Sequence, residues 1–305
     1  MGFSVRILGT SSATPTLSRH PSAQLLNVNE RLFLIDCGEG TQMQFRRYKI
    51  RHSRINHIFI SHLHGDHYLG LAGLLFTMHL FGRKAPLHLY GNPELMVLLE
   101  MQFRLSDTVL LYPLIFHPLN PGETSVIFED TWLQITAFPL MHRVPTHGFV
   151  FREKTFGRRI FKAAIASLSI PADRYQELRD GKDIVLENGV LVKNSEVTTA
   201  PRKALSFAYC SDTGYTDQYL KHIKGVDVLY HEATFMVEKE AGAREKMHST
   251  TQDAARIALQ SGAKRLIIGH YSARYDDLEP VLAETRALFP ESYLAEEGLE
   301  FMVSE

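Results

Sequence analysis

The sequence predicts an α/β domain in which strands are sandwiched between layers of helices. Short apolar runs rich in Val, Ile and Phe alternate along the chain with longer segments of helical periodicity. No fixed-period repeat of the kind that marks a solenoid is present. A chain of 305 residues, 45% of them hydrophobic, can bury a sizeable core. We therefore expect a single domain over residues 1–305.

The predicted strands and helices follow from local composition. Nine runs are rich in β-branched and aromatic residues and are predicted strands: 3–8, 31–36, 56–61, 87–91, 131–140, 148–153, 204–212, 226–233 and 265–270. Five segments carry apolar residues at helical spacing and are predicted helices: 40–50, 69–81, 93–103, 250–262 and 279–289. In the fourth helix Thr250 and Asp253 match a capping box, which places the helix start at Thr250.

One segment, from about residue 151 to residue 200, breaks this alternation. It has few strongly apolar stretches, and its own short strands flank an Asn188–Gly189 turn. An insertion between two core strands is expected to project from the domain, and long ordered insertions are more often functional than idle. We call residues 152–199 the arm.

Composition and charge restrict the class of protein. No stretch approaches the roughly 20 apolar residues that span a bilayer, and the N-terminus resembles neither a signal peptide nor an anchor. Cys37 and Cys210 end apolar runs and are expected to be buried free thiols in a reducing cytoplasm. The net charge of −1 indicates no nucleic-acid partner by itself. Two basic runs stand out, although each alone is more typical of a solvated face than of a binding patch: Arg46, Arg47, Lys49, Arg51 and Arg54, then Arg152, Lys154, Arg158, Arg159 and Lys162.

The stretch SHLHGDHYLG, residues 61–70, concentrates metal-ligand side chains. His62, His64, Asp66 and His67 occupy six positions at the end of a predicted buried strand, with the last two at the entry to the helix 69–81. A catalytic zinc takes three protein ligands and a water, so four candidate ligands on one turn favour two metal ions.

Other strand ends supply further ligand types. Predicted strands end at His142, Asp212 and His270. Ligands in α/β domains bind outside the carboxyl ends of strands, so we expect these side chains to complete the site.

These motifs resemble a known family. HLHGDH with later His, Asp and His at strand ends is similar to the metallo-β-lactamase fold, an αβ/βα sandwich of two sheets flanked by helices. GTSSATPT, FLIDCGEGTQMQ, PLMHRVPTHGF, YCSDTG, HEAT, HST and GHYSARY extend the resemblance over the whole chain, to short-form tRNase Z. The chain departs from that family at Ala13, where Gly is frequent, and at SIPADRYQEL, which lacks a usual Gly-Pro pair.

The resemblance implies a zinc-dependent endoribonuclease that removes the 3′ trailer of precursor tRNA. It implies two Zn²⁺ per chain, a cytoplasmic homodimer, a tRNA-binding exosite in the arm, and neither DNA nor a membrane as partner. Asp66 would accept a proton, and Glu232 and His248 would form a relay that protonates the leaving ribose oxygen. Asp212 would bridge the metals, of which one would be held by His62, His64 and His142 and the other by Asp66, His67 and His270.

Two other functions remain open at this point. A dinuclear hydrolase of small molecules would use the same ligands, but it would not need a basic arm. An RNA-binding protein with a structural metal would need only a closed site of four ligands and no general acid. Among the remaining histidines, His147 is the one rival to His142, and His231 is expected to be a buried structural residue.

Overall fold

The computed structural model describes residues 2–155 and 157–304, and within them two seven-stranded sheets form the core. The first has the order β18-β1-β2-β3-β4-β5-β6 and the second the order β17-β16-β15-β14-β9-β8-β7. The strands of the first sheet are β1 Phe3–Gly9, β2 Ala23–Val28, β3 Arg31–Ile35, β4 Ile55–Phe59, β5 Leu87–Gly91, β6 Leu114–Pro118 and β18 Glu300–Met302. Those of the second are β7 Ser125–Glu129, β8 Leu133–Leu140, β9 Thr146–Glu153, β14 Ser206–Cys210, β15 Val228–Glu232, β16 Arg265–Gly269 and β17 Ser292–Leu294.

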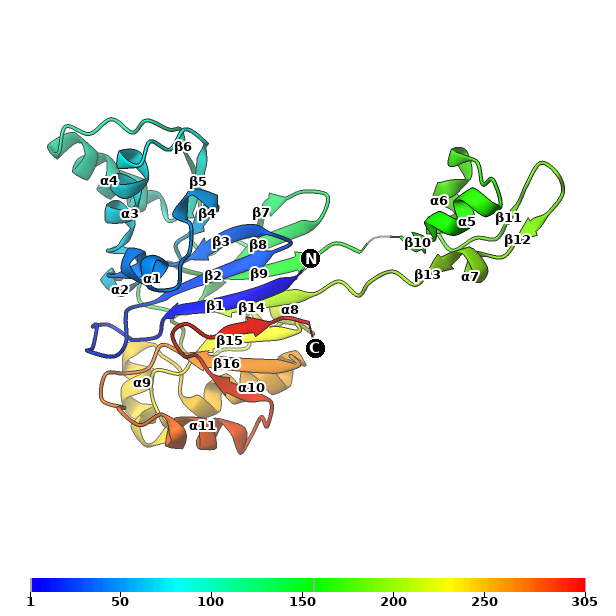
Figure 1. Ribbon diagram of the computed structural model, residues 1–305. Helices are drawn as coiled ribbons and strands as arrows, with labels where there is room; N and C mark the ends of the chain where they lie inside the picture. The colour runs from blue at the N-terminus through cyan, green and yellow to red at the C-terminus, as the bar shows by residue number, and fades with distance from the viewer. Residues whose placement is uncertain (1, 156, 305) are drawn as a thin grey trace. The chain divides into compact units, whose positions relative to one another are not determined.

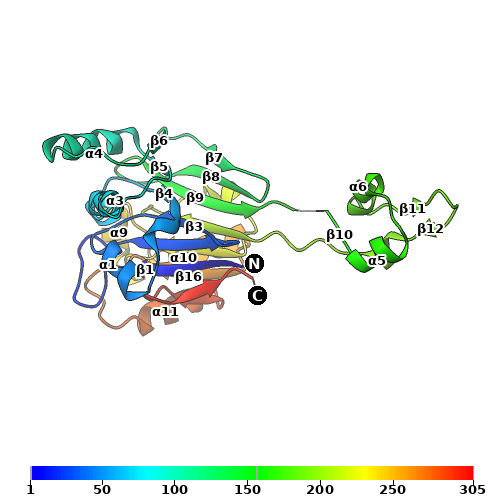
Figure 2. The same ribbon diagram turned by 45° about the horizontal axis from the view of Figure 1, so that its top comes forward.

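Helices cover the outer faces of the two sheets (Figure 1, Figure 2). The first sheet packs against α1 Thr41–Arg47, α3 Leu71–Leu80 and α4 Pro93–Leu105, which share one buried apolar cluster with it. The second packs against α8 Leu220–Ile223, α10 Thr251–Ser261 and α11 Glu279–Arg286. The shorter elements of this unit are α2 Gly65–Tyr68, α9 Glu240–Lys246, η1 His52–Arg54 and η3 Val237–Lys239. The predicted helices and strands are present, and the expected sandwich is observed.

Aromatic rings fill the space between the sheets. Phe33 and Phe59 of the first sheet meet Phe149 and Phe151 of the second, with Phe59 and Phe149 centroids 5.5 Å apart and Phe33 and Phe151 centroids 5.9 Å apart. These rings are buried, and such close-packed aromatic pairs hold two sheets in one relative position. The core therefore fixes the sheet edges from which the site residues emerge.

Residues 130–134 and 152–204 form a second compact unit with its own apolar core. Ile170, Leu178, Ile184, Val192 and Val197 are buried in that core. The elements of this unit are β10 Arg159–Ile160, α5 Lys162–Ser167, η2 Ala172–Arg174, α6 Tyr175–Arg179, β11 Ile184–Val185, β12 Leu191–Val192, α7 Asn194–Val197 and β13 Thr198–Thr199. β11 and β12 pair around the predicted turn, where Gly189 adopts a φ of 81°.

The helix predicted over residues 69–81 begins later than expected, at Leu71 of α3. The residues from 65 onward form two helices, because the Gly70 N–H donates to the Cys37 carbonyl at 2.9 Å rather than to a carbonyl one turn earlier. Asp66 and His67 consequently lie inside the short helix α2 instead of at the entry to α3. A Cβ at Gly70 would lie 2.1 Å from the Gly38 carbonyl oxygen, so this close approach requires glycine.

Candidate metal centre

The predicted metal ligands lie together at the ends of strands from both sheets. His62 and His64 follow β4, His142 follows β8, Asp212 follows β14 and His270 follows β16. The register of the second sheet aligns these ends, since Cys210 pairs with His231 and Glu232 pairs with Gly269 across parallel strands. Residues far apart in the sequence therefore meet at one edge of the sandwich.

His62, His64, His142 and Asp212 form the first ligand group. Each offers one ligand atom, and these atoms lie within 4.8 Å of one another. His142 Nε2 is 3.2 Å from His64 Nδ1, and Asp212 Oδ2 is 3.5 Å from His62 Nε2. Three imidazoles and a carboxylate converging on one point are a typical zinc ligand set.

Asp66, His67 and His270 form the second group. His67 Nε2 and His270 Nε2 are 3.3 Å apart, and Asp66 Oδ2 is 3.2 Å from His270 Nε2. Asp212 reaches this group through its other oxygen, because Oδ1 lies 3.3 Å from His67 Nε2 and 3.2 Å from His270 Nε2. The two oxygens of one carboxylate therefore face the two groups.

Unpaired buried atoms indicate that these groups fit a cation. His62 Nε2 and Asp212 Oδ1 are buried and make no hydrogen bond with the residues that the structure describes. An unsatisfied buried carboxylate oxygen is costly unless a positive charge lies next to it. A cation in the first group would satisfy His62 Nε2, and a cation in the second group would satisfy Asp212 Oδ1.

The protonation states agree with metal binding. Burial and the neighbouring His67 lower the pKa of His62 to about 4, which leaves its imidazole neutral at pH 7. Burial acts to raise the pKa of Asp212, but the surrounding histidines hold it well below its usual range. Burial acts to lower the pKa of His67, but three aspartates around it raise this pKa well above normal. In such a cluster, a bound cation can replace the proton of His67.

Asp36 supports the second group and was not among the predicted site residues. Its Oδ2 accepts hydrogen bonds from His67 Nδ1 at 2.8 Å and from the Tyr209 hydroxyl at 2.7 Å, while its Oδ1 accepts one from the Ser61 N–H at 2.7 Å. A carboxylate on Nδ1 fixes the tautomer and leaves Nε2 as the ligand atom. The available signal was the position of Asp36 at the end of the run RLFLID, like that of Asp212 after its strand.

Glu232 and His248 lie beside the metal ligands. Glu232 is the last residue of β15 and is fully buried, and His248 lies between α9 and α10. His248 Nδ1 is 2.9 Å from Glu232 Oε1 and 4.0 Å from Asp212 Oδ2. Burial acts to lower the pKa of His248, but the Glu232 carboxylate raises it to about 9. His248 is therefore protonated at neutral pH and has an acidic proton to give.

Thr234 links this pair to a metal ligand. Its hydroxyl donates to Glu232 Oε2 at 2.6 Å, and its oxygen lies 2.8 Å from His270 Nδ1. Because the hydroxyl proton goes to the carboxylate, the oxygen accepts the Nδ1–H of His270. One chain of hydrogen bonds therefore runs from His248 through Glu232 and Thr234 to His270.

The other histidines and the predicted cap lie apart from these groups. His147 is buried and directs Nε2 to the Asn120 carbonyl, and it belongs to none of the ligand groups found among the described residues. His231 is buried between the Tyr219 hydroxyl and the Glu232 carbonyl, as predicted. The Thr250 capping box is present, and both cysteines are buried free thiols.

The fold and the site define a metal-dependent hydrolase of the metallo-β-lactamase superfamily. The family model of the β-lactamase superfamily domain matches residues 196–271, and that of the anti-Pycsar protein Apyc1 matches residues 3–110. The structure superimposes on the short form of human tRNase Z with a TM-score of 0.73 and 28% identity, covering 99% of this chain and 100% of that one.

Sequence relatives narrow the class further. A ribonuclease Z of Bacteroides fragilis is 42% identical over 297 residues, 97% of this chain and 98% of the relative. A ribonuclease Z of Cytophaga hutchinsonii is 43% identical over 306 residues, which cover 100% of this chain and 97% of the relative. The chain belongs to the ribonuclease Z family.

Proposed function

We propose that this member of the ribonuclease Z family cleaves precursor tRNA endonucleolytically and removes its 3′ trailer. The products are a tRNA with a 3′-hydroxyl and a trailer with a 5′-phosphate. The observation that supports this reaction is the Glu232–His248 pair beside the ligand groups, because a structural metal site needs no acid. Neither a small-molecule substrate nor a purely structural metal is favoured by a family whose named relatives are ribonucleases.

Two zinc ions are the proposed cofactors. His62, His64 and His142 would hold one, and Asp66, His67 and His270 the other, with Asp212 shared between them. Bound metal ions supply Lewis-acid stabilisation of the charge that develops on the phosphoryl oxygens.

Asp66 is the proposed proton acceptor for the attacking water. Burial acts to raise its pKa, but His67 and His270 hold the pKa well below its usual range, so the carboxylate is ionised. The Ala13 N–H donates to Asp66 Oδ2 at 2.7 Å, which orients the carboxylate at the surface of the site. An ionised, oriented carboxylate positions a water and takes its proton.

His248 is the proposed acid for the leaving ribose oxygen. Its Nδ1–H faces Glu232, so Nε2 carries the proton that is available to substrate. Glu232 stabilises the imidazolium before transfer and holds the ring in place. The 3′-hydroxyl of the tRNA product follows from protonation at this atom.

The arm is the proposed exosite for the body of the tRNA. The arm has a compact apolar core, and its surface carries exposed cations that can contact phosphates without reading sequence: Arg159, Lys162, Arg179, Lys182 and Lys193. None of the proposed metal ligands lies in residues 152–199. The arm therefore contributes to binding and not to the chemical step.

A homodimer in the cytoplasm is also proposed. Large apolar side chains are exposed around α3 and α4, among them Leu80, Phe81, Leu105 and Val109, each more than 70% exposed. Exposed apolar side chains gathered on one region are typical of a protein–protein interface. Buried free thiols suit a reducing compartment. No helix among the described residues is long and apolar enough to cross a membrane.

The reaction is tested by incubating the purified protein with a precursor tRNA that carries a defined 3′ trailer. We expect one cut, a 3′-hydroxyl on the tRNA and a 5′-phosphate on the trailer. A 2′,3′-cyclic phosphate on the tRNA, or no cut with full metal loading, would contradict the proposal. Metal content near two per chain supports the dinuclear assignment, and light scattering tests the dimer.

A further inference from the structure

The basic run that precedes the metal-ligand turn has no role in the proposed chemistry or in the arm. We call Arg46, Arg47, Lys49 and Arg51 the α1 basic surface, because they occupy the end of α1 and the residues after it. All four are exposed or half-exposed, and none has an ion pair within residues 2–155 and 157–304. Unpaired like charges repel one another, and an anionic partner would relieve that repulsion.

The nearby residues do not neutralise this charge. Arg54, the fifth cation of the run, is already paired with Glu30 at 3.2 Å. The one acidic residue in 39–54 is Glu39, before the start of α1. Arg47 donates to the side-chain oxygen of Gln44 at 3.4 Å, which is a weak contact.

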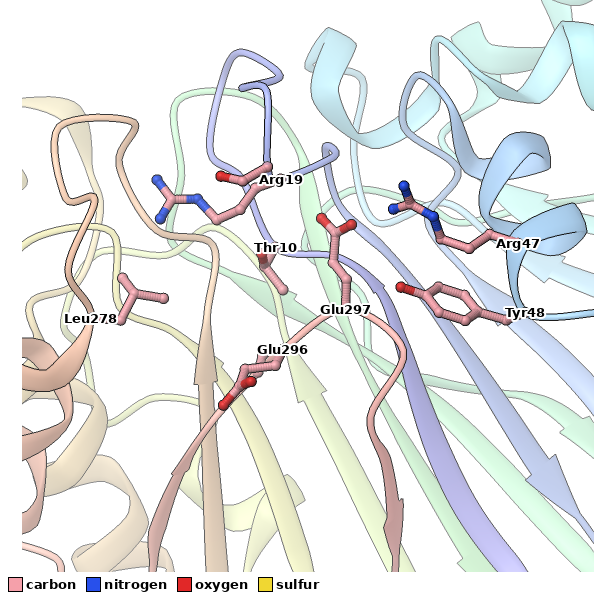
Figure 3. Close-up of a pocket in the computed structure, with 9 residues that line it drawn as sticks. Thr10, Arg19, Arg47, Tyr48, Leu278, Glu296 and Glu297 are labelled. Carbon is pink, nitrogen blue, oxygen red and sulfur yellow. The ribbon is translucent and has the colours of Figure 1, made fainter.

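A cavity of about 280 Å³ lies beside this surface. Arg47, the last residue of α1, and Tyr48 after it line one side of the cavity, and Arg19 lines the opposite side (Figure 3). Glu296 and Glu297 also line it, and Glu297 lies between Arg19 and Arg47. The Glu297 carboxylate accepts hydrogen bonds from the His20 N–H, the His20 ring and Gln44 Nε2, so protein groups already engage it. On the side of the cavity next to α1, Arg47 offers a cation to a phosphate, and Tyr48 offers a ring for a base.

The start of α1 is held against the metal-ligand turn. The Cys37 N–H donates to the His67 carbonyl at 2.8 Å, and a Cβ at Gly38 would lie 2.5 Å from the Asp66 carbonyl oxygen. α1 begins at Thr41 and has seven residues, which corresponds to roughly 10 Å of helix. The basic end of α1 is therefore close to the site.

The loop after β1 joins the cavity to the site from the other side. Thr10 and Arg19, at the two ends of this loop, line the cavity, and Ala13 between them donates to Asp66 Oδ2 at 2.7 Å. Arg19 also donates to the carbonyls of Ser272 and Tyr275, in the segment that follows His270. The cavity and the second ligand group therefore share one wall.

We infer that the α1 basic surface binds backbone phosphates of the precursor RNA close to the scissile bond. RNA is the ligand class because it is the anion that the proposed function brings to the neighbouring site, and the inference rests on that function. Contacts of this kind position the strand and carry no sequence information. The surface holds the RNA over the cavity while the ligand groups receive the scissile phosphate.

The test compares the wild type with the triple variant Arg46→Ala, Lys49→Ala and Arg51→Ala. The measurement is kcat/KM for precursor tRNA between roughly 50 and 200 mM salt, together with hydrolysis of bis-p-nitrophenyl phosphate, a small phosphodiester with no flanking nucleotides. Removing one phosphate-binding cation reduces the slope of log affinity against log salt by about 0.7–0.9. Removing three of them makes the salt-induced fall in kcat/KM roughly 20- to 40-fold smaller than in the wild type. Hydrolysis of the small phosphodiester should stay at the wild-type rate.

Arg54→Ala is the matched control, since it removes a cation of the same run that already has a partner. Its salt slope is expected to equal that of the wild type. An unchanged slope in the triple variant, or an equal change in Arg54→Ala, would overturn the inference. Failure of the wild type to cut the tRNA would instead contradict the proposed function. Substrates with one-nucleotide and long trailers locate the contact: an effect on the long trailer alone places it on the trailer, and an effect on both places it on the acceptor stem.

Discussion

Replacing Thr234 with Val tests whether the chain from His248 to His270 tunes the metal site. Valine preserves the shape of threonine and removes the hydroxyl, which contacts Glu232 Oε2 at 2.6 Å and His270 Nδ1 at 2.8 Å. His270 Nδ1 then loses its acceptor, whereas Glu232 keeps the backbone N–H of Thr234 at 3.1 Å and that of Thr213 at 2.9 Å. The ligand is therefore affected more than the carboxylate.

The expected magnitude follows from these contacts. Removing the hydrogen-bond partner of a ligating histidine typically weakens metal binding by about 10- to 100-fold. Leaving one buried N–H unsatisfied costs about 1–3 kcal/mol of stability, so the variant should remain folded. We expect weaker binding of the metal held by His270 and little change at the group formed by His62, His64 and His142.

The assay is competition for zinc between the protein and a chromophoric chelator, titrated over both binding steps. Thr234→Ser keeps the hydroxyl and is the matched control, so it should restore most of the affinity. A purely structural role would make serine, which lacks the methyl group, no better than valine. Unchanged affinity at both steps in a folded Thr234→Val protein would refute the link between Thr234 and His270.

Further predictions concern the bridge, the acid and the arm. Asp212→Ala should leave a folded protein with at most one weakly held metal and no cleavage, measured as metal per chain; normal cleavage with two metals would show that Asp212 is no bridge. His248→Ala should retain metal and tRNA but slow the chemical step by roughly 10²–10⁴-fold, and much less with a good leaving group; an equal loss on both substrates would exclude an acid role. Because the pKa of His248 is raised to about 9, the part of the wild-type rate that needs its proton should be present at neutral pH and fall as pH rises through about 9, a limb absent from the variant. The stability of the fold should change with pH in the same direction. The His248–Glu232 ion pair contributes fully to stability below the unfolded-state pKa near 6.5, and this contribution is lost as the pH rises through about 9. Replacing the arm with a Gly-Ser linker should preserve hydrolysis of a small phosphodiester and sharply reduce cleavage of precursor tRNA. The remaining tRNA cleavage should also lose most of its salt dependence, and unchanged tRNA cleavage would exclude the exosite.

The amino-acid sequence determined the local elements and the residue types of the site. Apolar periodicity depends on near neighbours, so the main strands and helices and the Thr250 cap were predictable. The four edge strands of the two large sheets, β6, β7, β17 and β18, were not predicted, because an edge strand depends on its partner strand more than on its own composition. The central strand β2 was also missed, although most of its residues are buried. Likewise, HLHGDH and the polar residues after strands indicated which side chains would meet, because parallel strands end at one edge.

Only the tertiary structure decided how those side chains contact one another. The parallel register sets Glu232 opposite Gly269, and this brings Thr234 to His270 although 36 residues separate them. Asp36 depends on the same kind of long-range packing, since its partner Tyr209 comes from the other sheet. The sequence showed the positive charge at the end of α1. It did not show that these cations lack ion pairs among the described residues, or that a cavity lies beside Arg47. Hydrogen-bond partners and unpaired charges are set by distances across the fold, which periodicity along the chain does not encode.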